Sequence, residues 1–251
     1  MGHRSLPPIL FGVTLLAAWH IIASLGVVPS YVLPAPIDVA RRLVSGVQSG
    51  YLISATGQTL FEALLGCLAA AILGIPLGYL LAKSQLAAHV IEPYLAASQA
   101  VPAVALAPLI VVWMGYGTLP ITVLCTIIVI FPVIVSTATG MRTLDREVVD
   151  AARLDGAAGA DLAWRIELPL AAPTILAGIR TGFTLSITGA IVGEMVMGGE
   201  GLGAALAAGQ GSTASTTFLF AVIALLAVLA IGIYLSLHLL ERRLDPLRES
   251  S

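Results

Sequence analysis

One stretch of this sequence limits the possible fold more than any other feature: residues 93–141 contain no Asp, Glu, Lys or Arg. As one helix these 49 residues would measure about 74 Å, more than twice the roughly 30 Å hydrocarbon core of a bilayer. The chain of 251 residues is 58% hydrophobic and 10% charged, whereas a soluble domain has roughly 25% charged residues. A water-soluble fold of this size could not bury so many apolar side chains. The composition therefore predicts an all-α membrane protein with one helical domain.

The uncharged stretch must fold back on itself, and Gly115, Gly117 and Pro120 mark the turn. Pro102 and Pro108 lie in the helix before this turn, where we expect them to kink it while neighbouring groups satisfy the freed carbonyls. A membrane helix needs about 20 apolar residues. This length predicts six membrane-spanning helices, at residues 6–28, 59–82, 91–114, 119–141, 171–197 and 218–240. The first could also be read as a signal peptide, but it is long and lacks a cleavage site, so we interpret it as an anchor.

Small residues in the second predicted span point to close helix packing. Gly66, Gly74 and Gly78 recur at spacings of eight and four residues, so they lie on one face of a helix. Small residues at such spacings allow a second membrane helix to approach closely. Ahead of this span, we expect a short surface helix that begins at Pro36, because proline is favoured in the first helical turn.

The distribution of Lys and Arg predicts the orientation in the membrane, because these residues are concentrated in cytoplasmic loops. Six crossings would place both termini and residues 142–170 on one face. That face would hold nine Lys and Arg residues, and the opposite face would hold two, Arg41 and Arg42. We therefore expect a multi-pass inner-membrane protein with both termini in the cytoplasm. The nine residues are Arg4, Lys83, Arg142, Arg146, Arg153, Arg165, Arg242, Arg243 and Arg248.

Several classes of function are disfavoured by what the sequence lacks. The formal net charge of −2 is not that of a polybasic nucleic-acid binder. The only lysine, Lys83, does not follow a glycine-rich turn, so the chain has no P-loop for ATP. No spacing typical of a metal site or of a catalytic motif is present among the histidines and cysteines. These residues are His3, His20, His89, His238, Cys67 and Cys125. We expect no enzymatic activity and no cofactor in this chain.

Residues 142–170 form the one polar segment in the interior of the sequence, and their pattern is helix, turn, helix. Asp155-Gly156 interrupts the helical spacing, and we expect Leu168-Pro169 to end the second helix before the next span begins. The pattern also places Leu154, Leu162 and Trp164 at the surface. Such a segment is either a solvated connection or a docking surface for another protein.

This segment also resembles a known signature. It consists of Asp150-Ala151-Ala152, three residues, Gly156, nine residues and Ile166-Glu167-Leu168-Pro169. The arrangement resembles the EAA loop of ABC importer permeases, which is Glu-Ala-Ala, three residues, Gly, nine residues and Ile-x-Leu-Pro. Asp150 stands in place of the usual Glu and keeps the carboxylate.

The resemblance to the nitrate, sulfonate and taurine branch of these permeases covers nearly the whole chain. It rests on Leu33-Pro34-Ala35-Pro36, Thr59-Leu60, Gly74-Ile75-Pro76-Leu77-Gly78 and Gly201-Leu202-Gly203. One departure is Glu62, whose position is often Arg in that branch. This departure is consistent with a different substrate or a different partner for the helix.

The resemblance implies the architecture of a type I ABC importer permease, with two copies or two close homologues forming the pore. It also implies an ATPase dimer that binds ATP and Mg, an extracytoplasmic substrate-binding protein and surrounding membrane lipid, but no nucleic acid. The helix after Gly156 would be the coupling helix that docks into the ATPase. Glycine there permits a backbone conformation that a Cβ would penalise. The coupling-loop residues that we expect are Asp150, Ala151, Ala152, Asp155, Gly156, Ala157, Ala158, Asp161, Ile166, Leu168 and Pro169.

Four residues near the outer ends of the spans are candidates for the translocation path: Glu62, Glu194, Met195 and Met197. Ionisable side chains are costly inside a bilayer, which makes the two carboxylates functional candidates. Interfacial solvation or a hydrogen bond between helices is the alternative role for both. Two acidic residues and no clustered cation near the pore are unfavourable for a small free anion such as nitrate, so an organic or uncharged solute is as compatible. The candidate substrates are a sulfonate, nitrate or taurine-like anion, or a vitamin or pyrimidine precursor. The alternative function is a secondary transporter or channel without an ATPase, for which inverted repeats would be expected.

Overall fold

The computed structural model describes residues 6–26, 28–209 and 213–244, with side chains described over 10–26, 28–209 and 216–232. Every regular element in these ranges is a helix. The α-helices are α1 (Leu6–Ser24), α2 (Pro36–Gln48), α3 (Tyr51–Lys83), α4 (Gln85–Ser98), α5 (Ala107–Met114), α6 (Thr118–Arg142), α7 (Arg146–Leu154), α8 (Gly159–Leu162), α9 (Leu168–Met197), α10 (Leu202–Ala208) and α11 (Thr213–Leu244). A 3₁₀ helix (η1, Ala103–Leu106) precedes α5, and a π-helical turn (η2, Ala163–Glu167) joins α8 to α9.

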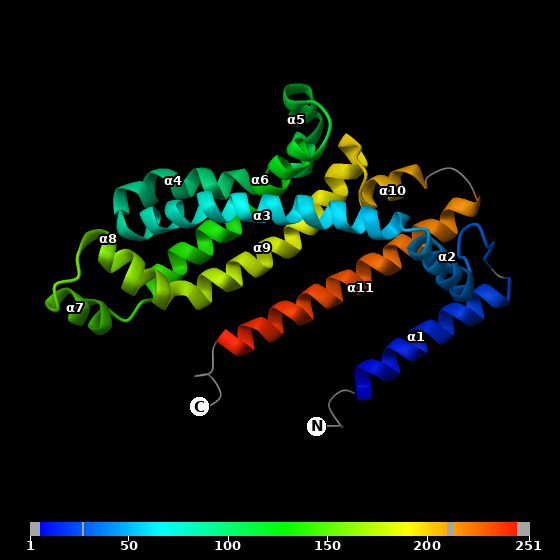
Figure 1. Ribbon diagram of the computed structural model, residues 1–251, viewed down its shortest axis with the longest axis horizontal. Helices are drawn as coiled ribbons and strands as arrows, with labels where there is room; N and C mark the ends of the chain where they lie inside the picture. The colour runs from blue at the N-terminus through cyan, green and yellow to red at the C-terminus, as the bar shows by residue number, and fades with distance from the viewer. Residues whose placement is uncertain (1–5, 27, 210–212, 245–251) are drawn as a thin grey trace.

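The centre of the molecule is a layer of three long helices, α3, α6 and α9, with α6 packed against both of the others (Figure 1). The short helices α7 and α8 lie at one end of this layer, and α2 and α10 lie near the other end. Helix α5 projects from one side of the layer, while α11 lies against α2. The two ends of the bundle therefore carry different short segments, each positioned by the same long helices.

The glycines of α3 lie where α3 meets α6, as the sequence predicts. A Cβ on Gly74 would come within 2.9 Å of Val133 Cγ1, and a Cβ on Gly78 would come within 2.6 Å of Ile134 O. A Cβ on Gly66 would overlap the Cβ of Cys125. The backbones of α3 and α6 therefore approach so closely that no larger residue fits without displacing backbone atoms.

Helix α9 approaches α6 through glycines in the same way, which the sequence reasoning did not anticipate. A Cβ on Gly182 would lie 2.6 Å from Val129 Cγ1, and a Cβ on Gly189 would lie 2.7 Å from Ile128 Cδ1. In the sequence these glycines are spread through an apolar run that also contains Thr and Ser. Only the position of α6 shows that Gly182 and Gly189 both face the same neighbouring helix.

Three helices among the described residues are long and apolar enough to cross a membrane: Tyr51–Lys83, Thr118–Arg142 and Gly159–Met197. A fourth candidate is the pair Gln85–Ser98 and Ala103–Met114, whose halves are bent by 82° relative to each other. The described apolar parts of α1 and α11, Leu10–Ser24 and Thr216–Gly232, are shorter. The count of six spans and the orientation stay predictions.

The predicted span at 91–114 is a broken helix in this structure and not a mildly kinked one. Helix α4 ends at Ser98, and the chain resumes in η1 after Pro102. Proline restricts the residue before it to extended conformations and donates no hydrogen bond, so it interrupts the helix at this point. The chain then leaves α5 through Gly115 and Gly117, whose φ angles are +78° and +122°.

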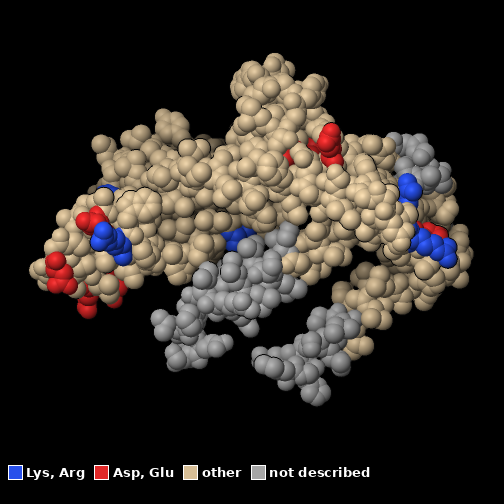
Figure 2. Space-filling model, viewed as in Figure 1, with Lys and Arg blue, Asp and Glu red and all other residues tan. Residues whose placement is uncertain are grey.

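Charged side chains gather mainly at the two ends of the molecule on the face that Figure 2 shows, over α7 and α8 at one end and over α2 at the other. The surface between them is mostly apolar on that face, with an acidic group near α10 and a basic group near the middle, and such a surface suits contact with lipid. Several residues used above to predict orientation or to consider metal sites cannot be placed: Arg4, Arg248 and His3 lie outside the described residues, and the side chains of Arg242, Arg243 and His238 are not described.

The close packing of α3 on α6 leads to a prediction for Gly78→Ala. We expect this variant to be less stable by about 1–3 kcal/mol, because the added Cβ meets backbone and Thr137 at 2.6 Å. The matched control is Gly57→Ala on the same helix, where nothing lies within 4 Å. Alanine there should be neutral or stabilising by about 0.5–1 kcal/mol. Thermal unfolding of the purified variants in detergent measures both effects, and equal behaviour of the two would contradict the packing.

Candidate functional site

Helix α7 ends in a hydrogen-bonded cap that requires glycine at position 156. The N–H of Gly156 donates to Arg153 O at 3.0 Å, and the N–H of Ala157 donates to Ala152 O at 3.0 Å. These two bonds form a Schellman motif, in which the residue after the helix takes a left-handed conformation. Gly156 has a φ of +91°. This agrees with the expectation that glycine supplies a backbone conformation that a Cβ would penalise.

The second helix of the polar segment does not stop at Leu168-Pro169, so that prediction was wrong. From Gly159 to Met197 the chain runs as one helical span. The π-helical turn Ala163–Glu167 comes directly before Pro169, which lies in the first turn of α9. Proline is tolerated in the first turn because the N–H that it lacks is not needed there. The second helix of the polar segment is therefore continuous with α9.

Two large apolar side chains of this segment are exposed to solvent. Leu154 is 90% exposed, and Trp164 is 73% exposed. The prediction that Leu162 is exposed as well was wrong, because Leu162 is only 8% exposed and therefore belongs to the buried face of α8. Ala158 and Ala160 are exposed and Ala157 is half-buried. The chain between the two large residues therefore carries mainly short side chains. Leu154, Trp164 and these alanines are the apolar residues that this segment presents to solvent, and we call this set the α7–α8 surface.

Two carboxylates of the segment, Asp150 and Asp161, pair with arginines three and four positions later in the chain. Asp150 accepts from Arg153 Nη1 at 2.8 Å, and Asp161 lies 3.2 Å from Arg165 Nε. All four side chains are more than half exposed, and such pairs contribute little to stability. The other predicted loop residues are distributed as follows: Ala151, Asp155 and Pro169 are exposed, and Ala152, Ile166 and Leu168 are half-buried.

An ion pair between a fully buried glutamate and a partly exposed lysine lies beneath this segment, and the sequence reasoning did not find it. Glu167 is fully buried, and its carboxylate accepts from Lys83 Nζ at 2.5 Å and from the Tyr79 hydroxyl at 2.9 Å. Glu167 belongs to the π-helical turn, whereas Tyr79 and Lys83 belong to the last turn and a half of α3. One sequence signal could have pointed to this pair. Lys83 is the single lysine of the chain and ends an apolar helix, where a charged side chain needs a partner.

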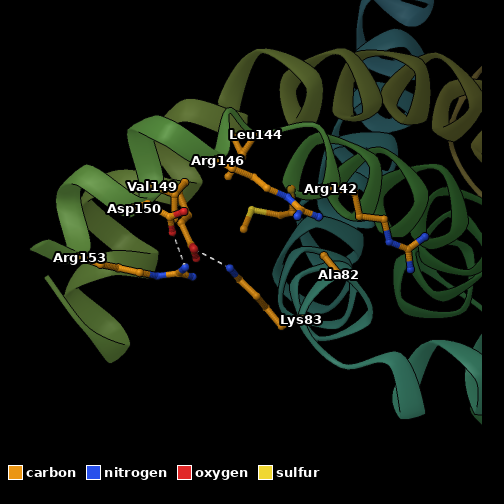
Figure 3. Close-up of a pocket in the computed structure, with 10 residues that line it drawn as sticks. Ala82, Lys83, Arg142, Leu144, Arg146, Val149, Asp150 and Arg153 are labelled. Carbon is orange, nitrogen blue, oxygen red and sulfur yellow. Dashed lines mark hydrogen bonds and ion pairs between the residues drawn. The ribbon is translucent and has the colours of Figure 1, made fainter.

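A cavity of about 430 Å³ opens beside this ion pair, between α7 and the ends of α3 and α6. In Figure 3 the side chains of Lys83 and Arg153 point toward each other across it, and Arg142 points away. Arg142 instead pairs with Glu92 of α4 at 2.7 Å. The charged side chains that line the cavity are Lys83, Arg142, Arg146, Asp150, Arg153 and Glu167.

The other end of the bundle contains a buried polar network around Glu194. Its carboxylate accepts from the Thr59 hydroxyl at 2.7 Å and from the N–H of Gly203 at 2.5 Å. The Thr59 oxygen in turn accepts the N–H of Leu202 at 2.8 Å. The first N–H groups of a helix have no partner within it. Here Thr59 and Glu194 satisfy two of those of α10, the N–H groups of Leu202 and Gly203, and they tie α10 to α3 and α9.

The other path candidates lie around this network. Glu62 is buried, and its Oε1 accepts from Gln58 Nε2 at 2.7 Å, while Oε2 has no hydrogen-bond partner among the described residues. Met197 is fully buried, and Met195 is 38% exposed. The carboxylates of Glu62 and Glu194 therefore face neighbouring helices in this conformation. No group of three or more potential metal ligands occurs in the described part of the chain.

Comparison with known proteins places this architecture in a family. The family model described as the binding-protein-dependent transport system inner membrane component matches residues 74–246. The chain belongs to this family. It is thus a permease component of an ABC importer, as the EAA-like loop predicted, and the resemblance inferred from that loop is confirmed.

Curated relatives span most of the chain. It is 38% identical to the riboflavin transport system permease protein RibX of Chloroflexus aurantiacus, with 92% of this chain and 85% of the relative covered. It is 31% identical to the formylaminopyrimidine transport permease protein ThiX of Halalkalibacterium halodurans, with 80% of each covered. It is 29% identical to the taurine transport system permease protein TauC of Escherichia coli, with 92% and 86% covered.

The fold is shared with a solved ABC transporter. The inward-facing methionine transporter MetNI matches with a TM-score of 0.69 and 18% identity, over 78% of this chain and 97% of that chain. At this level of identity the likeness concerns the fold alone. It supports an arrangement of membrane helices like that of ABC permeases.

The network around Glu194 leads to a prediction for Thr59→Val. Valine has nearly the same shape but neither accepts the N–H of Leu202 nor donates to Glu194, so we expect a loss of about 1–3 kcal/mol of stability. Hydrogen exchange of the α10 amides should also become faster. The control is Thr56→Val on the same helix, because among the described residues the Thr56 hydroxyl bonds only Leu52 O of its own helix. A Thr59→Val variant as stable and as protected as the control would contradict this role.

Proposed function

We propose that this permease crosses the inner membrane six times, with both termini and the α7–α8 surface in the cytoplasm. The excess of Lys and Arg on that side of the predicted topology supports this orientation. The mostly apolar surface between the two charged ends supports a position across the bilayer. Helix α3, with 33 residues, is about 50 Å long and can extend beyond the hydrocarbon core at its ends.

The single observation that carries the proposal is the α7–α8 surface itself. Leu154 and Trp164 are large apolar side chains held in water at the end of a membrane bundle, next to a chain segment made of alanine and glycine. Large exposed anchors beside small residues are the arrangement by which a short helix docks into a groove of a partner. The partner is an ATPase dimer that binds ATP and Mg, since this chain has no P-loop.

In this mechanism ATP binding closes the ATPase dimer and moves the docked segments together. Because α8, the π-helical turn and α9 form one continuous helix, a movement of the docked segment is transmitted into the membrane. The pore is formed by two copies of this chain, and a substrate-binding protein delivers the solute from the opposite side. The transition is a rigid-body switch between inward- and outward-facing states, biased by ATP.

For the substrate, we propose an uncharged heteroaromatic vitamin or a pyrimidine precursor. The relatives named for riboflavin and formylaminopyrimidine transport have 38% and 31% identity, and the taurine relative has 29%. The candidate path residues at the outer end of the bundle include two carboxylates, Glu62 and Glu194, and no cation, which is unfavourable for a small anion. At this end the path would be bordered by Glu62, Glu194, Met195 and Met197. The path would open when α10 separates from α3.

Reconstitution tests this function directly. The permease is purified with a candidate ATPase and placed in proteoliposomes with binding proteins loaded with riboflavin, formylaminopyrimidine or taurine. ATP-dependent uptake with one of the first two is the expected result. Uptake only with taurine would overturn the substrate proposal. Uptake that proceeds without any ATPase would favour the secondary transporter.

The cap at Gly156 leads to a second expectation for this function. Gly156→Val should abolish coupled uptake without preventing membrane insertion, because a side chain at this φ costs about 1–2 kcal/mol and turns α8 away from its docking direction. Gly156→Asn should retain more activity, since asparagine tolerates left-handed backbone. Gly26→Val is the matched control, because Gly26 has a φ of +66° in open space after α1. Full uptake by Gly156→Val with its ATPase bound would contradict the role of the loop.

The apolar anchors lead to a third expectation. Leu154→Ala and Trp164→Ala should each weaken association with the ATPase by at least about tenfold, as is typical of central apolar anchors. Leu86→Ala is the control, because Leu86 of α4 is 76% exposed but lies outside the α7–α8 surface. Affinity is measured by titrating the ATPase against the permease in lipid nanodiscs. If all three variants bound the ATPase with the same affinity, the docking site would lie elsewhere on the permease.

A further inference from the structure

The π-helical turn Ala163–Glu167 is the place where the docking segment meets the rest of the molecule. Helix α7 has this turn as its main packing partner. Helices α8 and α9 are continuous with the turn on either side. A π-helical turn inside an α-helix is uncommon and is frequently found at functional sites. A force applied to α8 therefore reaches α9 through these five residues, and α7, which is also joined to α6 by residues 143–145, packs on the same turn.

One side chain of this turn is connected to a different membrane helix. Glu167 is fully buried and is held by Lys83 Nζ at 2.5 Å and by the Tyr79 hydroxyl at 2.9 Å. Lys83 Nζ also lies 5.6 Å from the centre of the Tyr79 ring. A buried carboxylate is unfavourable unless a cation and hydrogen-bond donors surround it, so Glu167 cannot move away from these two partners without a large penalty.

The surroundings of the ion pair differ on its two sides. On the membrane side, α3 is packed against α6 through Gly74 and Gly78, where the helices are too close to slide past each other easily. On the side of α7, the cavity of about 430 Å³ separates α7 from the ends of α3 and α6 (Figure 3). The ion pair is thus a fixed point on α3 next to a helix that has room to move.

We propose that Glu167, Lys83 and Tyr79 form a joint that transmits the movement of the docked segment to α3 as well as to α9. This inference rests on the proposed docking of the ATPase and identifies positioning residues for it. With the joint intact, α3, α6 and the π-helical turn move as one body when the ATPase closes. Without it, the segment tilts into the cavity, and ATP is hydrolysed with little movement of α3.

The test uses Lys83→Met and Glu167→Gln in the complete transporter, reconstituted with its ATPase and loaded binding protein. We expect the ATPase to co-purify with both variants and the amount of solute moved per ATP to fall about tenfold, within the usual range of coupling between sites. Lys83→Arg should keep most of the coupling because it preserves the charge. The exchanged pair Lys83→Glu with Glu167→Lys should recover part of it.

Two further variants separate a joint from a merely structural contact. Glu92→Gln breaks the 2.7 Å ion pair with Arg142 at the same end of the bundle, but this pair joins α4 to α6 and does not involve the π-helical turn. It should leave solute per ATP unchanged. Tyr79→Phe keeps the ion pair and removes one hydrogen bond, so it is expected to fold even if the charge variants do not, and to lower solute per ATP several-fold.

The outcomes are distinguishable. If the variants lower the yield or the melting temperature but leave solute per ATP unchanged, the cluster is structural and the inference is overturned. It is also overturned if Lys83→Met abolishes binding of the ATPase while Tyr79→Phe transports normally, because the cluster would then belong to the docking surface. Failure of the wild type to bind any ATPase would instead refute the proposed function and would be seen before any variant is made.

Discussion

The close approach of α3 and α9 to α6 is the contact on which the rest of this structure depends. Hydrophobic burial does not drive helices together inside lipid, so packing of backbone against backbone must supply the association. Glycine at positions such as 74, 78 and 182 removes the side chains that would hold the helices apart. The result is a stiff layer of three helices, and every polar contact of the candidate site is built onto the ends of that layer.

A buried glutamate joins a short helical segment to α3 at each end of the layer. Two glutamates, Glu167 at one end and Glu194 at the other, are fully buried, and each connects a short helical segment to α3. At one end the partner is Lys83, and at the other it is Thr59 together with backbone N–H groups of α10. A buried carboxylate with complete hydrogen bonding specifies a position more sharply than apolar contact does. Helix α3 therefore links the segment proposed to bind the ATPase with the segment proposed to border the outer end of the path.

Much of the candidate site could be predicted because its signals are local. The cap at Gly156 depends on a few neighbouring residues, and the EAA-like spacing pointed to the family before any fold was known. Leu162 was misplaced because helical spacing does not say which face another helix covers. The expected stop at Pro169 was wrong because a π-helical turn precedes the proline and the helix continues through it. The sequence pattern does not reveal such a turn. The Lys83–Glu167 pair was missed because its members are 84 positions apart.

The sequence by itself determined that this chain enters a membrane, that it is helical, and where its polar segment and its tight glycine turns lie. These properties follow from composition, from the length of apolar runs and from backbone freedom, all of which act over short distances along the chain. Only the tertiary structure decided which glycines face α6, that α4 and α5 bend by 82°, and which carboxylates are buried. Those properties depend on which helices become neighbours, since a charge inside a membrane protein is tolerated only where folding brings its partner.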